Sequence, residues 1–161
     1  MSHTKIKMLV MDVDGTMTDG KIYMGNTGEL MKAFDVRDGY AIRHLLRENG
    51  VVPVIITGRA SSIVQNRARE LNITELYQGI GDKLYRLKTI AAGYGLTAGE
   101  IAYLGDDLND LECIRYCGIS GCPRNAVKEI RETVDYVCEH SGGDGAVREF
   151  IEKLVAGELE Q

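Results

Sequence analysis

Two acidic residues near the start of the chain have the spacing of side chains that can share one site. Asp12 and Asp14 follow the apolar run 6–11 and are separated by a single residue. Residues two apart on an extended strand point to the same side, so both carboxylates can face one site where the strand ends. Two neighbouring carboxylates repel each other unless a cation compensates, and a hard divalent ion with oxygen ligands would do so. The alternative is that both acids cap the following turn.

A second acidic segment, 105–110, offers further oxygen ligands for such a cation and reads Gly-Asp-Asp-Leu-Asn-Asp. Mg²⁺ prefers near-octahedral oxygen ligation and usually keeps several waters, and Asp12 and Asp106 are its preferred carboxylate ligands here. Asp107 would support them directly or through a water molecule. Asp110 either joins this group or caps the helix that follows.

Three residues farther along the chain are candidates for holding a phosphate group. Thr57 and Gly58 end the apolar run 51–56, where a hydroxyl and free backbone N–H groups can bind phosphate oxygens. The same pair is common at ordinary strand ends. Lys83 stands at a predicted helix start, where a lysine gains nothing from the helix dipole. Lys83 is either an ordinary surface lysine or the cation that neutralises a carboxylate nucleophile and the phosphoryl group that it receives.

The elements that must position these residues alternate between strand and helix. Short apolar runs predict strands at 6–11, 51–56, 75–77, 101–104, 118–120 and 135–137. Helical spacing of apolar residues predicts helices at 39–48, 61–71, 83–94, 109–116, 126–131 and 146–155. This order predicts an α/β fold with a Rossmann-like parallel sheet and helices on both faces. Ligands bind beyond the carboxyl ends of such strands, where the polar turns would converge.

One segment interrupts the alternation. Residues 21–24 and 30–34 flank Gly25-Asn26-Thr27-Gly28, a sequence suited to a tight turn. We therefore expect a β-hairpin flap at about 20–35, next to Asp12. No linker or repeat divides the sequence, so the expectation is a single domain over residues 1–161.

Bulk properties exclude several classes of protein. Hydrophobic residues at 44% and charged residues at 27% are typical of a globular domain. A net charge of -5 offers no basic surface for a polyphosphate, so nucleic acid is not an expected partner. No apolar run approaches the roughly 20 residues of a membrane span, which predicts a soluble cytoplasmic protein. The four cysteines lack the spacing of a zinc site and are expected to be reduced thiols.

The chemistry-bearing segments resemble a known superfamily. Asp12-Val13-Asp14-Gly15-Thr16, then Thr57, Lys83 and Gly105-Asp106-Asp107, are similar to the four ordered motifs of the haloacid dehalogenase superfamily. The resemblance implies that Asp12 is a nucleophile that forms an aspartyl-phosphate and that Asp14 is the general acid and base. It also implies that Mg²⁺ binds Asp12, Asp106 and the backbone carbonyl of Asp14, while Thr57 and Lys83 hold the phosphoryl group. No long insertion could form the separate cap domain of many relatives.

A narrower resemblance is to the capless 3-deoxy-D-manno-octulosonate 8-phosphate phosphatase group and its nonulosonate 9-phosphate relatives. It extends to Thr18-Asp19-Gly20, the hairpin, Thr57-Gly58-Arg59 and residues 79–83 and 141–149. It implies a phosphorylated sugar acid as substrate, a role in lipopolysaccharide biosynthesis, and a homotetramer whose sites are completed by a neighbouring subunit. In this group, an arginine after Thr-Gly is typical of the octulosonate enzymes, and a glutamate at that position is typical of the nonulosonate enzymes. Arg59 would bind the substrate carboxylate.

Two further segments have open interpretations. Arg67 is a second candidate for the substrate or for the subunit contact. The stretch 141–145 is either a flexible connector or a loop of the active site or interface. Asp144 stands where many members of the group carry a basic residue, so its role is open.

Other functions fit the residue pattern less well. A phosphorylation-dependent receiver also uses an aspartate, Mg²⁺, a hydroxyl and a lysine. Receivers, however, have an adjacent acidic pair after the first strand, where this chain has Asp-x-Asp. A phosphomutase must shield its intermediate from water, which is difficult without a cap. A noncatalytic assembly module would not need the complete catalytic set.

Overall fold

Six parallel strands form the central sheet, and their spatial order differs from their order in the chain. The structure is a computed structural model that describes residues 4–159. The strands are β1 (Met8–Met11), β4 (Val52–Ile56), β5 (Glu75–Tyr77), β6 (Ile101–Leu104), β7 (Ile119–Cys122) and β8 (Tyr136–Val137). They lie in the order β5-β4-β1-β6-β7-β8, and all neighbours are parallel. The chain thus moves outward from β1 on one side and then from β6 on the other. This reversal makes the β1/β6 boundary the switch point at which such sheets bind ligands.

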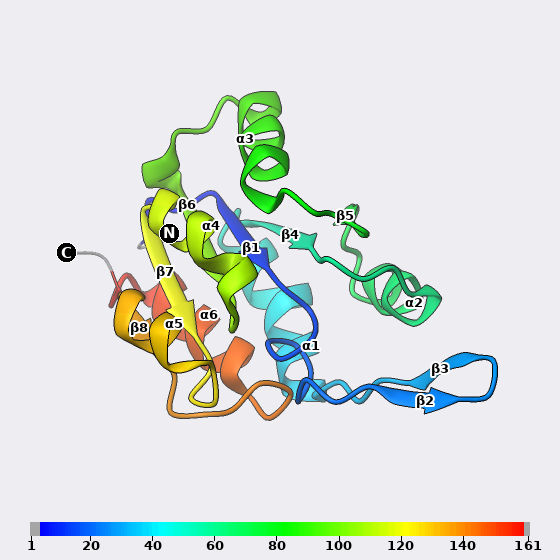
Figure 1. Cartoon of the computed structure of the whole chain (residues 1–161). Coiled ribbons are helices and arrows are strands. Elements are labelled where there is room, and N and C mark those ends of the chain that lie inside the picture. Colours follow the sequence, from blue (N-terminus) through cyan, green and yellow to red (C-terminus); the bar gives the residue numbers. More distant parts are fainter. Residues whose placement is uncertain (1–3, 160–161) are drawn as a thin grey trace.

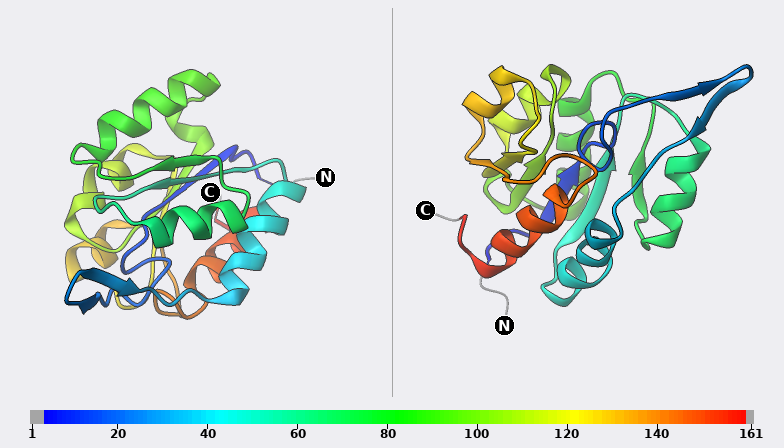
Figure 2. Two further views of the ribbon diagram at one scale, coloured as in Figure 1. Left: turned by 90° about the vertical axis from the view of Figure 1, so that its right-hand side faces the viewer. Right: turned by 90° about the horizontal axis from the view of Figure 1, so that it is seen from below.

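Helices cover both faces of the sheet, as expected for right-handed crossovers between parallel strands (Figures 1 and 2). The α-helices are α1 (Val36–Tyr40), α2 (Ser62–Glu70), α3 (Lys83–Tyr94), α4 (Leu111–Tyr116), α5 (Lys128–Thr133) and α6 (Ala146–Ala156). The other helical elements are a π-helix, η1 (Ala41–Leu46), and two 3₁₀ turns, η2 (Ala98–Glu100) and η3 (Leu108–Asp110). The predicted α/β fold with a parallel sheet is confirmed.

The two faces of β1 feed two separate apolar cores. Leu9 and Met11 pack with residues of η1, α2 and α6, whereas Met8 and Val10 pack with residues of α3, α4 and α5. This alternation follows from the two-residue period of a strand. All four side chains are fully buried, so β1 is fixed from both sides. Residues just beyond its carboxyl end therefore start from a rigid base.

Local signals in the sequence set the start and end of α3. The Asp82 side chain accepts a hydrogen bond from the backbone N–H of Tyr85, which caps the helix N-terminus. Gly95 adopts the left-handed conformation with φ of 67° and ends the helix. Lys83 is consequently the first residue of the helix and stands at the carboxyl edge of the sheet.

A β-hairpin projects from the sheet beside α2 (Figures 1 and 2). It consists of β2 (Tyr23–Gly25) and β3 (Gly28–Met31), with Gly25 paired to Gly28. The predicted hairpin is present, but its strands lie closer to the turn than 21–24 and 30–34. The reason is that the glycine pair leaves only two residues in the turn.

Some predicted boundaries were wrong. The helix expected at 39–48 begins at Val36, because the Asp35 side chain caps it by accepting from the backbone N–H of Arg37. It then continues as the π-helix rather than as a regular α-helix. The strand and helix expected at 118–120 and 126–131 are shifted by a few residues toward the C-terminus. Within residues 4–159, the structure contains no helix of the length and apolarity that a bilayer crossing requires.

Candidate active site

Asp12 and Lys83 meet at the carboxyl edge of the sheet and form a buried ion pair. Asp12 directly follows β1, and Lys83 opens α3. The lysine Nζ lies 2.9 Å from Asp12 Oδ1 and 2.8 Å from Asp110 Oδ1. Asp12 is 5% exposed and Lys83 is 4% exposed. Burial alone would lower the pKa of Lys83, but the two carboxylates outweigh it and raise that pKa. The lysine is therefore charged and aimed at Asp12.

Asp110 is a fully buried support for this pair. One of its oxygens, besides contacting Lys83, accepts a hydrogen bond from the Tyr103 hydroxyl at 2.6 Å. The other accepts from the backbone N–H groups of Asp106 and Asp107 at 3.0 and 3.3 Å. Both oxygens thus have partners in the protein, which leaves Asp110 poorly suited as a direct metal ligand. Its side chain makes no capping hydrogen bond to α4 but closes the capping box of η3 by accepting from the backbone N–H of Asp107.

Asp106 completes the acidic cluster. It follows β6, the strand beside β1, and its carboxylate accepts a hydrogen bond of 2.8 Å from the Thr16 hydroxyl. One oxygen each of Asp12, Asp106 and Asp110 lie within 4.8 Å of one another. Asp107, in contrast, is exposed and caps η3 by accepting from the backbone N–H of Leu108 at 2.7 Å. The structure thus brings Asp106 to Asp12 and turns the Asp107 side chain to solvent.

The charge of this cluster fits a divalent cation. If all three carboxylates were ionised, the cluster and the Lys83 ammonium together would carry a net charge of about -2. Burial, followed by repulsion from Asp110, raises the pKa of Asp12 above its ordinary value. Burial and repulsion from Asp12 do the same for Asp106. Such shifts show that negative charge is undercompensated here, and a hard cation with oxygen ligands would relieve it. Asp12 and Asp106 are the carboxylates with oxygens left to offer.

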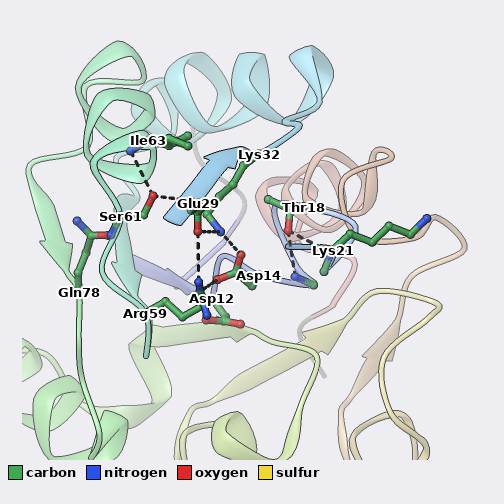
Figure 3. A network of polar contacts seen from close by, with 12 residues as sticks. Asp12, Asp14, Thr18, Lys21, Glu29, Lys32, Arg59, Ser61, Ile63 and Gln78 are labelled. Carbon is green, nitrogen blue, oxygen red and sulfur yellow. Dashed lines mark hydrogen bonds and ion pairs between the residues drawn. The ribbon is translucent and has the colours of Figure 1, made fainter. Parts of the chain in front are cut away.

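Asp14 lies next to Asp12 but faces the hairpin (Figure 3). Its carboxylate forms an ion pair with Lys32, which directly follows β3, and lies 4.0 Å from the Arg59 Nε. Glu29 on β3 is 3.2 Å from Lys32 and 3.5 Å from Arg59. Glu29 also accepts a hydrogen bond of 2.8 Å from the Ser61 hydroxyl. Hairpin residues of the same chain therefore form one wall of the site.

The remaining predicted residues have different surroundings. Thr57 is buried directly after β4, whose pairing of Ile55 with Met11 makes both strands end at the same edge. Gly58 is exposed. Arg67 packs under the exit of the hairpin instead: it lies over the Phe34 ring, donates to the backbone carbonyl of Asp35 at 3.3 Å, and pairs with Glu70 at 2.9 Å.

The glycine-rich loop 141–145 packs tightly against the loop after β1. A Cβ added at Gly142 would lie 2.0 Å from the Gly15 carbonyl oxygen, and one at Gly143 would clash with the backbone of Thr18 and Asp19. The backbone N–H of Gly142 also donates to Asn125 at 3.0 Å. This loop therefore supports the active-site loop and is not a loose connector. The Asp144 side chain pairs with Arg37 at 3.0 Å.

Sequence reasoning missed several residues that the structure places at the site. Thr16 and Tyr103 support the acidic cluster, Lys32 contacts Asp14, and Glu29 and Ser61 lie behind Lys32. Tyr103 lies within an apolar strand, and its hydroxyl, the one polar side-chain group of that strand, was the signal that it has a polar partner. Lys32 and Glu29 have the spacing of an ordinary exposed hairpin, and only their three-dimensional neighbours distinguish them.

Comparison with known proteins agrees with this geometry. The family model described as haloacid dehalogenase-like hydrolase matches residues 69–151. The chain is 42% identical over 150 residues to the 3-deoxy-D-manno-octulosonate 8-phosphate phosphatase of Escherichia coli K12, covering 93% of this chain and 79% of that protein.

Solved structures give the same result. The crystal structure of this phosphatase from Yersinia pestis superposes with a TM-score of 0.91 at 42% identity, covering 98% of this chain and 85% of that one. The enzyme from Moraxella catarrhalis, solved with magnesium, phosphate and KDO, gives a TM-score of 0.91 at 39% identity, covering 95% and 87%. The chain therefore belongs to the haloacid dehalogenase-like hydrolases and, within them, to the 3-deoxy-D-manno-octulosonate 8-phosphate phosphatase family.

Proposed function

We propose that this protein hydrolyses 3-deoxy-D-manno-octulosonate 8-phosphate with Mg²⁺ and through an aspartyl-phosphate on Asp12. The observation that carries the proposal is the buried Asp12–Lys83 pair within an undercompensated acidic cluster at the switch point of the sheet. The 42% identity to enzymes of this name supports the substrate. A place in lipopolysaccharide biosynthesis depends on the same substrate assignment.

Asp12 is the proposed nucleophile. A carboxylate attacks an anionic phosphate only if their repulsion is offset, and Lys83 provides a fixed cation 2.9 Å from Asp12. Asp110 and Tyr103 hold that lysine in place. Thr57 and the backbone around Gly58, at the end of the neighbouring strand, would hold phosphoryl oxygens.

Asp12, Asp106 and the backbone carbonyl of Asp14 are the groups that would hold Mg²⁺. Bound there, the ion supplies charge neutralisation to the nucleophile and the phosphoryl group. Thr16 fixes the orientation of the Asp106 carboxylate through its 2.8 Å hydrogen bond. Asp107, whose side chain is exposed, would act on the metal only through water.

Asp14 is the proposed general acid and base. As an acid it gives a proton to the leaving alkoxide, and as a base it later takes a proton from the water that hydrolyses the aspartyl-phosphate. A side chain two residues from the nucleophile can reach the leaving group without competing for phosphorus.

Arg59 is the residue proposed to bind the carboxylate of the substrate. Its side chain is 49% exposed at the mouth of the site, and its nearest acidic partner on the hairpin, Glu29, is 3.5 Å away. A guanidinium can bind both oxygens of a sugar-acid carboxylate. A nonulosonate 9-phosphate, the alternative substrate, also carries a carboxylate, and only a direct comparison separates the two.

The protein is proposed to act as a homotetramer. Each chain would form a single domain, with the hairpin as a flap. Its hairpin and α1 expose large apolar side chains in the isolated chain: Met24, Leu30, Met31, Val36 and Tyr40. Such an apolar patch is typical of a protein interface. Arg67, beneath the hairpin exit, would then contact the neighbouring subunit or its substrate. The four cysteines are free thiols, which supports the proposed cytoplasmic location.

A substrate panel tests the proposal. Phosphate release is measured from octulosonate 8-phosphate, a nonulosonate 9-phosphate and simple phosphate esters, each with Mg²⁺ and with EDTA. The proposal expects Mg²⁺-dependent turnover with the highest kcat/KM for the octulosonate ester. Equal kcat/KM values for all esters would refute the substrate, and turnover in EDTA would refute the metal.

A further inference from the structure

Four charged residues form a closed ring between the hairpin and the loop after β1 (Figure 3). We name this the charge ring; its members are Asp14, Lys32, Glu29 and Arg59. Signs alternate around it: Asp14 contacts Lys32, Lys32 lies 3.2 Å from Glu29, Glu29 lies 3.5 Å from Arg59, and Arg59 lies 4.0 Å from Asp14. The hairpin supplies two of the four charges.

Lys32 is the best-fixed cation of the ring. Its side chain is 1% exposed, whereas that of Arg59 is 49% exposed. A buried ammonium is tolerated only when carboxylates compensate it, and Lys32 contacts two, on Asp14 and Glu29. Solvent weakens the exposed and more distant Arg59 interaction much more strongly. The orientation of the Asp14 carboxylate is therefore set mainly by Lys32.

Glu29 fixes Lys32 in turn. Besides its contact with the lysine, the Glu29 carboxylate accepts a hydrogen bond of 2.8 Å from the Ser61 hydroxyl, just before α2. The hairpin is thereby attached to the body of the domain by polar contacts at the ring. Because Lys32 directly follows β3, any displacement of the hairpin moves the lysine and with it the Asp14 carboxylate.

We propose that Lys32 is a positioning residue that holds the Asp14 carboxyl group where it can deliver its proton to the leaving oxygen. This inference rests on the proposed function. In the step concerned, a carboxylate oxygen of Asp12 forms a bond to phosphorus while the bond from phosphorus to the leaving oxygen breaks. Asp14 enters this step as the neutral acid. The electron pair of the broken bond goes to the leaving oxygen, the Asp14 proton is transferred to that oxygen, and the carboxylate that remains is paired with Lys32. Without Lys32, the Asp14 carboxylate turns toward Arg59, its remaining cation.

The test compares two esters with Lys32→Met. An alkyl ester, the sugar-acid phosphate, needs a proton on its leaving oxygen, whereas p-nitrophenyl phosphate releases a stable anion without one. The value of kcat/KM is measured for each ester because it reports on the steps up to phosphoryl transfer to Asp12. Slow hydrolysis of the aspartyl-phosphate therefore does not mask the effect. We expect kcat/KM to fall by about 100-fold for the alkyl ester and by about threefold or less for the aryl ester. Lys32→Arg should restore most of the alkyl activity.

Lys21→Met is the matched control. Lys21 is an exposed lysine near the base of the same hairpin, and its side chain points away from Asp14 (Figure 3). It should leave both values of kcat/KM unchanged. Glu29→Gln, which weakens the hold on Lys32, should lower the alkyl-to-aryl ratio in the same direction and decides the question if Lys32→Met does not fold.

The outcomes separate the inference from the proposed function. Equal losses on both esters in Lys32→Met and Glu29→Gln would overturn the positioning role while leaving the phosphatase intact. A wild-type protein that hydrolyses neither ester would overturn both.

Discussion

The Lys83 ammonium lies 2.9 Å from the Asp12 carboxylate, although 71 positions separate the two residues in the chain. The contact arises because β1 and α3 both present these residues at the carboxyl edge of one sheet. Asp110, 27 positions farther on, holds the lysine from its other side. This three-residue arrangement leads to the first two predictions.

Asp12→Asn should abolish turnover while leaving the fold intact. The amide is nearly the same shape but is not a nucleophile toward phosphorus, so the rate should fall by at least about 10⁴-fold. Phosphate release measures the loss, and circular dichroism checks the fold. Retained activity would remove Asp12 from the nucleophile role.

Lys83→Met should destabilise the metal-free protein. It leaves Asp12 and Asp110 as buried carboxylates without their cation, and breaking such a pair costs about 3–5 kcal/mol. Urea unfolding measures the change. Lys88→Met, on the exposed side of the same helix, is the control and should change stability by less than about 1 kcal/mol. Similar losses in both variants would contradict the role assigned to Lys83.

Mg²⁺ should raise Tm more at pH 8 than at pH 5. Burial raises the pKa values of both ligands, helped by repulsion from Asp110 at Asp12 and from Asp12 at Asp106, so protons compete with the metal as the pH falls. At a concentration about 100 times its Kd, the metal should add about 2.7 kcal/mol. Thermal melts with Mg²⁺ and with EDTA give the comparison. A shift of Tm that is larger at pH 5 would argue against these carboxylates as ligands.

Asp38 should make the protein less stable as the pH rises from about 4 to about 6. Burial raises the pKa of this carboxyl from 3.8 to about 6, so the folded state binds the proton more tightly than the unfolded state. Protonated Asp38 therefore stabilises the folded state fully below pH 3.8, and this stabilisation is lost as the pH rises through about 6. Asp38→Asn should therefore add on the order of 2 kcal/mol at pH 7 and almost nothing at pH 4. The amide oxygen still accepts the Arg148 N–H. Urea unfolding at both pH values provides the measurement, and an equal effect at both would contradict the assignment.

Gly142→Ala should reduce both stability and activity. The added Cβ would lie 2.0 Å from the Gly15 carbonyl oxygen, a backbone atom that cannot move without shifting the loop after Asp12. A loss of about 2 kcal/mol or more and a lower kcat are expected. Gly93→Ala, where nothing lies within 4 Å of the added Cβ in α3, should instead stabilise by about 0.5–1 kcal/mol. A neutral Gly142→Ala would show that the two loops are not tightly packed.

Elements with strong local signals were predictable from the sequence. The strand at 101–104 and the helix at 83–94 were predicted with the bounds that the structure has. An uninterrupted apolar run defines the first, and Asp82 and Gly95 mark the two ends of the second. The convergence of Asp12 and Asp106 at one edge also followed from the alternation of strands and helices, whereas the place of Lys83 beside them followed from the family resemblance.

Contacts made by folding alone could not be predicted. The charge ring depends on the contacts of the hairpin with Asp14, and the residue pattern of the hairpin gives no sign of these contacts. The continuation of α1 as a π-helix that packs against α6 likewise has no signal in the residue pattern, which predicted a regular helix at 39–48.

The contact of Gly142 with Gly15 also has a consequence for biosynthesis. The ribosome makes the loop carrying the nucleophile first and the segment that supports it more than 120 residues later. A nascent chain that still lacks residues 141–145 therefore has nothing packed against this side of the loop after β1. We expect enzymatic competence to appear only after residues 141–145 have been synthesised, so products truncated before this loop would be inert rather than partly active.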